Sequence, residues 1–313
     1  MTDLELGPLR FGIVGAGRLG QCVARALVAQ GFEVVHASSR SQAGRDAAAH
    51  ALQIPVHEDP LAVSEHVDCV VLCVPDDAVA GVVHRLATRP SDASPMRLRV
   101  VSMSAAGGVA ALQPLAALGH VTCVVHPVAT LADTECQPSD LAGAGAGVAA
   151  DDDAARTFAG AVAHALGLVP FDVPAPAWPL HAAACTLAAN GVVAMLAAAE
   201  TIAEDAGIAD GAVAGAYARL AERAVQRTIR SGPVDAMAGP ILRGDAASIA
   251  RQIVAVREST REIDALFIPV VATIANRAFL AGRLTMQQHR ELLEAVLDPT
   301  QFDDGTFRFR ETD

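Results

Sequence analysis

The chain has 313 residues, of which 52% are hydrophobic, and a formal net charge of −12 at neutral pH. This length is sufficient for two domains, and so high an apolar content excludes a disordered or low-complexity chain. The negative charge excludes a non-specific nucleic-acid surface, which needs clustered Lys and Arg, and favours a small molecule as the partner.

The sequence shows no pattern of a targeting segment. Residues 1–10 include Asp3 and Glu5 and no apolar run, so a secretory signal is not expected there. Later segments do not approach the roughly 20 consecutive apolar residues that a membrane helix requires. We therefore expect a cytoplasmic protein without a membrane partner.

Short apolar strands alternate with helical segments over the first half of the chain. The predicted strands are 11–14, 33–37, 68–74, 98–103, 121–125, 146–149 and 168–173. The helical patterns between them include 19–30, 78–88, 109–118 and 153–166. Runs as continuously apolar as 67–74 are typical of parallel strands covered on both faces. The pattern predicts an α/β fold with a doubly wound Rossmann sheet.

Three prolines within residues 173–179 end this alternation, and we place the domain boundary there. The expected domains are a Rossmann domain at 1–174 and a helical domain at 175–313. Ala-rich helical patterns in the second domain cover 181–206, 211–231, 246–281 and 286–297. They predict an all-α domain, and their small residues would suit close packing in a homodimer.

The six cysteines form no CxxC pair, and the histidines have no metal-ligand spacing. From these spacings we expect buried free thiols and no metal site.

A GxGxxG motif lies between the first predicted strand and the first predicted helix. Its residues are Gly15, Ala16, Gly17, Arg18, Leu19 and Gly20. Gly15 would permit the tight turn, Gly17 the close approach of a pyrophosphate, and Gly20 the packing of helix on strand. The helix N-terminus would supply N–H groups to the phosphates. The motif predicts a dinucleotide site, with a glycine-rich turn that holds no ligand as the alternative.

The end of the second predicted strand indicates which dinucleotide is bound. NAD-specific domains present a carboxylate there, about 20 residues beyond the glycines. The sequence HASSRS at 36–41 offers none, whereas Ser38, Ser39 and Arg40 could hold a 2′-phosphate. We therefore expect NADP(H) as the cofactor, with Arg40 as a solvated loop residue the alternative. A second glycine run, at 143–147, leads into a strand and is interpreted as a small-residue loop.

Five motifs in order extend the pattern over nearly the whole chain. They are GIVGAGRLG (12–20), VPDDAVAGV (74–82), HPVATLAD (126–133), HAAACTLAANGV (181–192) and GPILRGDAASI (239–249). Together they resemble the domain-of-unknown-function family numbered 2520, whose members join a Rossmann domain to a helical domain and are described as NADP-dependent oxidoreductases. That family is similar to the 6-phosphogluconate dehydrogenase superfamily, which includes pyrroline-5-carboxylate reductases.

The resemblance implies an active site between the two domains. Segments 74–77, 102–106, 126–130 and 181–190 would line it, with Val74, Pro75 and Ser104 as cofactor contacts. For Ser104, the alternative is an ordinary loop serine.

Two residues typical of the relatives are missing from this sequence. Many superfamily dehydrogenases carry Lys-x-x-x-Asn-Gly on the first long helix, where this chain has Thr186 in place of the lysine, followed by Asn190. Thr186 and Asn190 are four residues apart and would share a helix face, but a threonine hydroxyl is a poor proton donor. The family's His-x-Ser-Gly segment is also absent at 102–106.

Two histidines remain as candidates for proton transfer. His126 is expected to end a strand at the carboxyl edge of the sheet, and Pro127 to fix the loop after it. His181 lies near the start of the first long helix and is the second choice. Structural roles, in a loop hydrogen bond or in packing at the helix start, are the alternatives.

A break at 239–245 precedes another predicted helix. Asp245 is expected to cap that helix, and Arg243 could anchor an anionic substrate through its planar guanidinium. An ion pair between helices or subunits is the alternative for Arg243. We assign both residues to substrate binding.

Two functions therefore remain open. The first is reduction of a small carbonyl or imine by NADPH, with Asn190 orienting the substrate and Thr186 beside it. The second is a non-catalytic NADP(H)-binding sensor or accessory protein, which the missing lysine favours.

Overall fold

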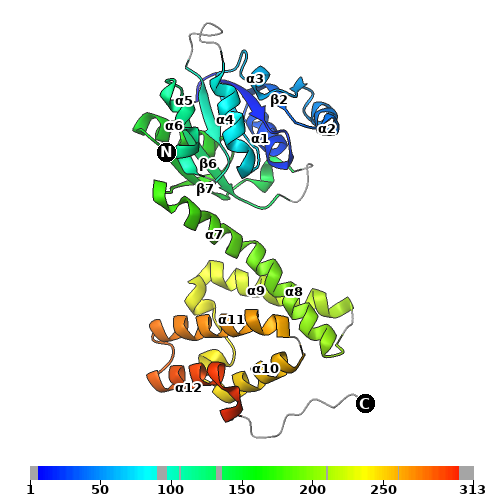
Figure 1. The fold of residues 1–313 in the computed structure, drawn as a ribbon, viewed down its shortest axis with the longest axis vertical. Coiled ribbons are helices and arrows are strands. Elements are labelled where there is room, and N and C mark those ends of the chain that lie inside the picture. The colour runs from blue at the N-terminus through cyan, green and yellow to red at the C-terminus, as the bar shows by residue number, and fades with distance from the viewer. Residues whose placement is uncertain are drawn as a thin grey trace. The chain divides into compact units, whose positions relative to one another are not determined.

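The computed structural model describes residues 6–89, 97–105, 107–131, 136–208, 211–259 and 261–302. Ala106 of the predicted 102–106 segment and residues 132–133 of the motif HPVATLAD lie outside these ranges. The chain divides into two compact units, residues 1–187 and residues 188–313. Figure 1 shows the elements of both units, coloured along the chain.

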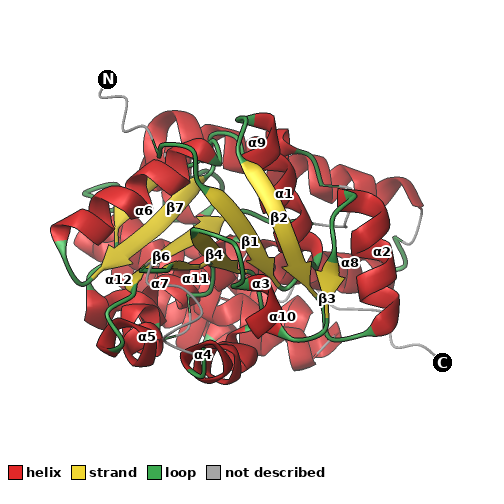
Figure 2. Cartoon of the chain, turned by 90° about the horizontal axis from the view of Figure 1, so that it is seen from above, coloured by secondary structure: helices red, strands yellow, loops and turns green. Residues whose placement is uncertain are grey.

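The first unit contains an eight-stranded sheet of order β3-β2-β1-β4-β5-β6-β7-β8. The strands are β1 Arg10–Val14, β2 Glu33–Ser38, β3 Val56–His57, β4 Cys69–Leu72, β5 Arg99–Ser102, β6 Val121–Val128, β7 Gly145–Ala150 and β8 Val169–Asp172. Neighbouring strands are parallel except β6 and β7, which are antiparallel. Figure 2 shows this sheet in yellow. The order confirms the predicted Rossmann-type fold.

Helices cover both faces of the sheet because alternate strand residues point in opposite directions. On one face, Ile13 and Val125 pack with α1 (Arg18–Ala29) and α6 (Asp153–Ala165). On the other face, Val14 and Val124 pack with buried side chains of the remaining crossover helices. Those helices are α3 Pro60–Val63, α4 Val79–Ala87 and α5 Gln113–Ala117. A further helix, α2 (Gln42–Leu52), contacts α1.

The structure corrects the predicted end of β6. The strand continues through Pro127 to Val128, so His126 lies within it and Pro127 does not begin a loop. The reason is the antiparallel pairing with β7, which places His126 opposite Gly147. Two glycines of the run at 143–147 are therefore part of a strand, not only of a loop.

The second unit is helical. Its helices are α8 Asn190–Asp205, α9 Gly211–Ala236, α10 Ala246–Ser259, α11 Arg261–Leu280 and α12 Met286–Leu297. The predicted helix at 246–281 is two helices, because α10 and α11 pack against each other and against α12 around buried residues such as Ile253 and Leu292. At Gly232, with φ +79°, the backbone of α9 is kinked, just after the predicted end at 231.

The division between the units follows α7 (Trp178–Ala188) and not the prolines at 173–179. Trp178 is 1% exposed and packs in the same core cluster as Val124 and Val173 of the sheet domain. Burial of a large aromatic ring on the sheet holds the start of α7 to the first unit. The expected boundary between residues 174 and 175 therefore lies before the helix that completes this unit.

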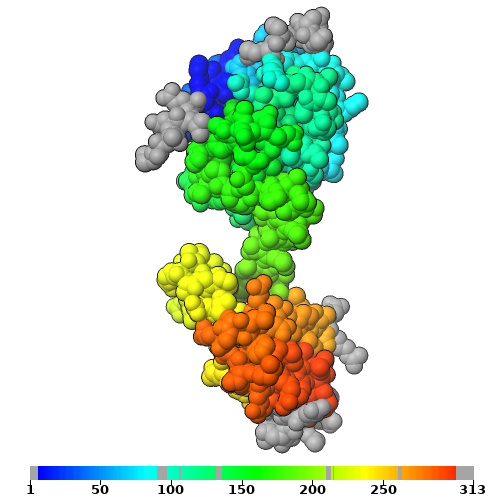
Figure 3. All heavy atoms as spheres, turned by 90° about the vertical axis from the view of Figure 1, so that its left-hand side faces the viewer, coloured from blue at the N-terminus to red at the C-terminus, as the bar shows by residue number. Residues whose placement is uncertain are grey.

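Two helical stretches, Ala175–Asp205 and Ile263–Leu280, are long and apolar enough to cross a membrane by length and composition alone. The expectation that no segment approaches the roughly 20 apolar residues of a membrane helix was wrong, because alanines extend these two stretches. The first stretch is drawn in green in Figure 3 and includes the exposed side chains of Leu180 and Leu187.

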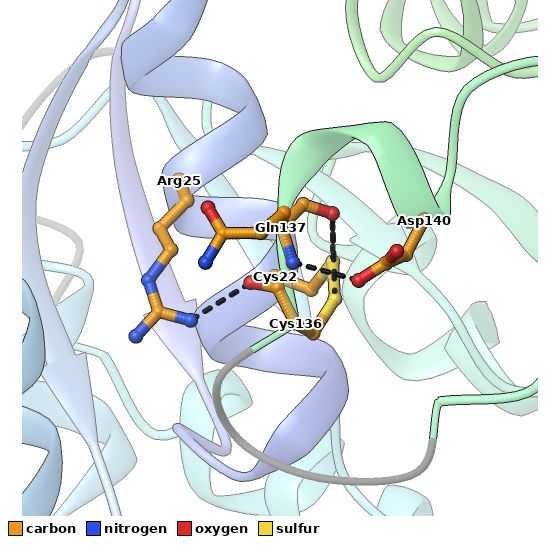
Figure 4. The surroundings of a disulfide bond; sticks show 5 residues. All are labelled: Cys22, Arg25, Cys136, Gln137 and Asp140. Carbon is orange, nitrogen blue, oxygen red and sulfur yellow. Dashed lines mark hydrogen bonds between the residues drawn. A yellow bond between two sulfur atoms is a disulfide. The ribbon is translucent and has the colours of Figure 1, made fainter.

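One pair of cysteines is joined in a disulfide. Cys22 on α1 is bonded to Cys136, which lies after β6, across a sequence separation of 114 residues (Figure 4). The guanidinium of Arg25, one turn along α1, donates to the carbonyl of Cys136 at 2.9 Å. The expectation that all thiols are free was therefore wrong for these two. Cys69, Cys73, Cys123 and Cys185 are free.

Candidate functional site

The glycine motif forms the predicted turn between β1 and α1. Gly15 has φ +96°, and a Cβ atom there would lie 2.6 Å from the carbonyl oxygen of Cys73. A Cβ atom on Gly20 would lie 2.1 Å from the carbonyl oxygen of Gly15. At Gly17, by contrast, a Cβ atom would meet none of the described atoms within 4 Å. Gly15 and Gly20 thus make the turn possible, and Gly17 leaves its outer side open.

Hydrogen bonds hold this turn in one conformation. The N–H groups of Gly15 and Ala16 both donate to the carbonyl of Ser38, at 3.1 and 2.8 Å. The buried amide of Gln21 donates to the carbonyl of Ala16 at 3.1 Å. The backbone is therefore fixed before a ligand arrives, and the first turn of α1 presents N–H groups that have no carbonyl partner within the helix.

A groove of about 240 Å³ opens beside the turn. Its lining includes most of the predicted cofactor residues, namely Gly15, Ala16, Gly17, Ser38, Ser39, Arg40, Val74 and Pro75. Two other predicted residues are at the start of α1, where Arg18 is exposed and Leu19 packs against the core. Segments that are far apart in sequence thus meet along one groove at the carboxyl ends of β1, β2 and β4.

The predicted 2′-phosphate residues differ in accessibility. Ser38 is 4% exposed, whereas Ser39 is half-buried and Arg40 is exposed. The guanidinium of Arg45 donates to the carbonyls of Ser39 and Arg40, at 3.1 and 2.7 Å. Arg45 therefore shapes this loop. Among the described residues, Arg40 makes no ion pair of its own.

One lining residue was missed by the sequence analysis. Glu58 follows β3, lines the groove beside Arg40, and lies 3.2 Å from Arg45. The pattern that indicates NAD specificity concerns only the end of β2, and β3 is too short for its strand pattern to be recognised. A carboxylate is therefore present near the loop, paired with a cation.

A second group of polar side chains is formed by one residue of β6 and two residues of α7. The Nδ1 atom of His126 is 3.1 Å from the Nε2 atom of His181 on α7. The Sγ atom of Cys185, one turn further along α7, is 3.9 Å from the same Nε2 atom. The two predicted proton-transfer residues are thus in direct contact, and a thiol that the sequence analysis did not single out is beside them.

The register of β6 and β7 makes room for this histidine pair. Directly opposed residues of an antiparallel pair project to the same face, and His126 is opposite Gly147. A Cβ atom on Gly147 would lie 3.0 Å from the Nε2 atom of His181. The buried ring of Trp178 packs edge-on against His126 and His181, with centroid distances of 6.5 and 5.5 Å. The imidazole positions are therefore set by packing.

Burial and charge alter the acidity of His126. Its surroundings lower the pKa of His126, first by desolvation and then by the neighbouring His181, while the Asp76 carboxylate acts in the opposite direction. Ser104, which is 6% exposed, donates its hydroxyl to that Asp76 carboxylate. Ser104 therefore contacts the residue after Pro75 and is not part of the groove lining.

The remaining predicted residues are on α7 and in the second unit. The hydroxyl of Thr186, on α7, donates to the carbonyl of Ala182 at 3.1 Å. Asn190 begins α8 and belongs to the second unit, as do Arg243 and Asp245. Their predicted roles in binding or catalysis stay predictions.

Asp245 does cap α10 as expected. Its carboxylate accepts from the N–H of Ser248 at 3.0 Å, and this bond lowers the pKa of Asp245. The exposed Arg243 offers its own carbonyl to the amide of Gln288 at 3.3 Å.

Comparison with known domain families gives two matches. Residues 1–127 match the Rossmann-like domain, and residues 145–268 match the family described as Domain of unknown function (DUF2520). No curated protein sequence matches this chain.

Several solved structures share the fold. The protein BF3122 from Bacteroides fragilis, a candidate NADP oxidoreductase, is 18% identical with a TM-score of 0.67, covering 85% of this chain and 98% of its own. Protein TM1727 from Thermotoga maritima is 15% identical with a TM-score of 0.67, covering 87% and 99%. A pyrroline-5-carboxylate reductase from Coxiella burnetii is 17% identical with a TM-score of 0.55, covering 95% and 100%. The chain joins a Rossmann-like domain to a region that matches the DUF2520 domain family.

Proposed function

We propose that the protein is an NADP(H)-dependent oxidoreductase that reduces a small carbonyl or imine compound. The observation that carries this proposal is the preformed glycine turn, which opens on the groove that also contains Ser39 and Arg40. Two proteins of similar fold, the candidate NADP oxidoreductase and the pyrroline-5-carboxylate reductase described above, support the same reaction class.

Two parts of the groove can bind the phosphate groups of NADP(H), namely the glycine turn and the end of β2. At the turn, Gly17 has no side chain and its outer side is open, so a pyrophosphate can approach the backbone and the positive end of α1. At the end of β2, the exposed guanidinium of Arg40 has no ion-pair partner in the described part of the chain, and it can bind a 2′-phosphate with two parallel hydrogen bonds. The Ser39 hydroxyl can add a third.

Glu58 does not remove the preference for NADP(H). Its carboxylate is within ion-pair distance of Arg45, so its charge is partly neutralised beside Arg40. The local balance of Arg40, Arg45 and Glu58 is one net positive charge, which favours the phosphate over a free ribose hydroxyl.

A bound nicotinamide supplies the hydride, and the protein has to supply a proton to the reduced oxygen or nitrogen. The histidine pair is the proposed source. His126 and His181 are half-buried and in contact, so a proton given up by one imidazole can be replaced through the other. Asn190 is proposed to orient the substrate, with Thr186 beside it and Arg243 and Asp245 as binders of an anionic group.

A non-catalytic NADP(H)-binding protein is the second candidate. The observation that favours it is the hydrogen bond of the Thr186 hydroxyl to its own helix, because this position would hold the catalytic lysine in many relatives. Calorimetric titration with NADPH, run beside turnover assays on keto acids and cyclic imines, separates the two candidates. NADPH binding with substrate-dependent oxidation supports the reductase, and binding without oxidation supports the second candidate.

We also propose that the protein is a cytoplasmic homodimer through its second domain. Large apolar side chains are exposed on α9, including Leu220 at 66% and Ile229 at 73%. Surfaces of this kind are typical of subunit contacts. Light scattering of the wild type and of Ile229→Glu tests this, with a dimer expected for the first and a monomer for the second.

A further inference from the structure

We propose that His126, His181 and Cys185 form a binding site for a divalent metal ion of the zinc class. The inference rests on the positions of these three side chains in the first unit and does not depend on the proposed reductase activity. The sequence by itself predicts no metal site, because its histidines and cysteines have no metal-ligand spacing.

The ligand atoms are as close as a shared metal ion requires. The Nδ1 atom of His126, the Nε2 atom of His181 and the Sγ atom of Cys185 all lie within 4.8 Å of one another. The nitrogen atoms are 3.1 Å apart, and the sulfur is 3.9 Å from the nearer nitrogen. With Zn–N bonds of about 2.0–2.1 Å and Zn–S bonds of about 2.3 Å, tetrahedral ligand atoms are about 3.3–3.6 Å apart. Small shifts of the side chains would therefore bring all three into coordination.

Two regular elements hold the ligands. His181 and Cys185 are four residues apart on α7, so they project from the same face of the helix. His126 projects from β6 toward that face, and the absence of a side chain on Gly147 lets His181 approach the strand. Ligands on a strand and a helix are held more rigidly than ligands on loops.

Aromatic side chains surround His181, as is usual around the ligands of a metal ion. Trp178 and Phe171 pack edge-on against His181, with centroid distances of 5.5 and 5.6 Å, and restrict the rotation of its ring. Such apolar surroundings orient the ligands and lower the local dielectric constant. All three ligand residues are half-buried, so an ion could reach them from solvent and keep a fourth position for water or an oxygen or nitrogen ligand.

The ligand chemistry selects the ion. Two imidazoles and a thiolate suit Zn²⁺ and Co²⁺, whereas Mg²⁺ and Ca²⁺ prefer oxygen ligands. Three protein ligands with an open fourth position are typical of zinc ions that polarise a bound molecule. A bound ion would occupy the two nitrogen atoms that face each other in the histidine pair. Metal binding and proton exchange between these two rings therefore exclude each other.

Cobalt binding to the full-length protein tests the site. Anaerobic protein, with Cys185 reduced and chelator removed by desalting, would be titrated with Co²⁺ and followed by absorption spectroscopy. We expect one ion per chain, with a near-ultraviolet band from the thiolate–Co²⁺ bond that Zn²⁺ abolishes by competition. The variant Cys185→Ser should lose this band, and His181→Asn should bind at least about 100-fold more weakly, since even loss of a residue that only supports a ligand costs roughly 10–100-fold.

Controls separate loss of a ligand from loss of the fold. His164→Asn replaces an exposed histidine on α6, away from the three ligands, and should bind Co²⁺ like the wild type. Circular dichroism of the metal-free variants checks that they are folded, and Zn²⁺ should raise the Tm of the wild type but not of Cys185→Ser. Failure of the wild type to bind Co²⁺, or an unchanged band in folded Cys185→Ser, would overturn the proposal and leave a hydrogen-bonded histidine pair.

Discussion

The Nδ1 atom of His126 lies 3.1 Å from the Nε2 atom of His181, across a sequence separation of 55 residues. His126 is on β6 and His181 is on α7. The local sequence around either histidine therefore does not specify the contact. Both rings are half-buried, and burial followed by the neighbouring His181 lowers the pKa of His126.

The variant His126→Asn should reduce turnover by about 100-fold or more once a substrate is known, because general acid catalysis contributes this much. The Kd for NADPH should change little, since His126 does not line the groove beside the glycine turn. Steady-state kinetics and calorimetry give the two values, with His164→Asn as the matched control. Wild-type turnover in folded His126→Asn would remove this residue from the mechanism.

The variant Arg40→Ala should reduce the preference for NADPH over NADH. A charge-assisted hydrogen bond contributes about 1.5–3 kcal/mol, which corresponds to roughly 10-fold to 100-fold in affinity. Calorimetry with both dinucleotides measures the ratio, and Arg219→Ala, an exposed position on α9, is the control. Equal affinities of the wild type for NADPH and NADH would contradict the proposed role.

Substitution of Gly17 should affect NADPH binding, whereas substitution of Gly20 should affect the stability of the domain. Gly17→Val should leave the fold intact, since no described atom lies within 4 Å of its Cβ position, but should abolish NADPH binding by filling the space of the pyrophosphate. Gly20→Ala should destabilise the domain by about 1–3 kcal/mol, because its Cβ would lie 2.1 Å from the carbonyl oxygen of Gly15. Urea denaturation and calorimetry distinguish them. Normal NADPH binding by folded Gly17→Val would argue against a dinucleotide site.

Loss of the disulfide should lower the free energy of unfolding. The Cys22–Cys136 bond spans 114 residues, and a loop of this size contributes about 2–5 kcal/mol. Cys22→Ser and Cys136→Ser should each show this loss in urea denaturation without reductant. Under the same conditions, alkylation followed by intact-mass measurement should label neither residue in the wild type. Labelling of both in the native protein would show that the thiols are reduced.

The stability of the first unit should decline below pH 6.5 in part through His120. Burial, followed by the nearby charges of Arg89 and Arg97, lowers the pKa of His120 from 6.5, and its Nδ1 atom accepts from the N–H of Leu98 at 3.3 Å. The unfolded chain then binds more protons than the folded chain, so this contribution is complete above pH 6.5 and is lost as the pH falls through the lowered pKa. Urea denaturation between pH 5 and pH 8 should show a smaller slope for His120→Gln. An equal slope would contradict this assignment.

The local sequence predicted the features that depend on neighbouring residues. Apolar runs indicated every strand through Val173 except the two-residue β3. The spacing of Gly15, Gly17 and Gly20 specified the turn, since Gly15 has φ +96° and a Cβ atom on Gly20 would meet the carbonyl of Gly15. The cap of α10 by Asp245 was predictable for the same reason, because the donor is three residues away.

Only the tertiary structure decided the contacts between distant segments. The antiparallel pairing of β6 with β7 set His126 opposite Gly147, and the burial of Trp178 placed α7 on the first unit and brought His181 and Cys185 to that position. The partner of Cys22, the ion pair of Glu58 with Arg45, and the contact of the two histidines depend likewise on how the sheet orders its strands. Sequence periodicity records which face of an element is buried, but it does not record which other element covers that face.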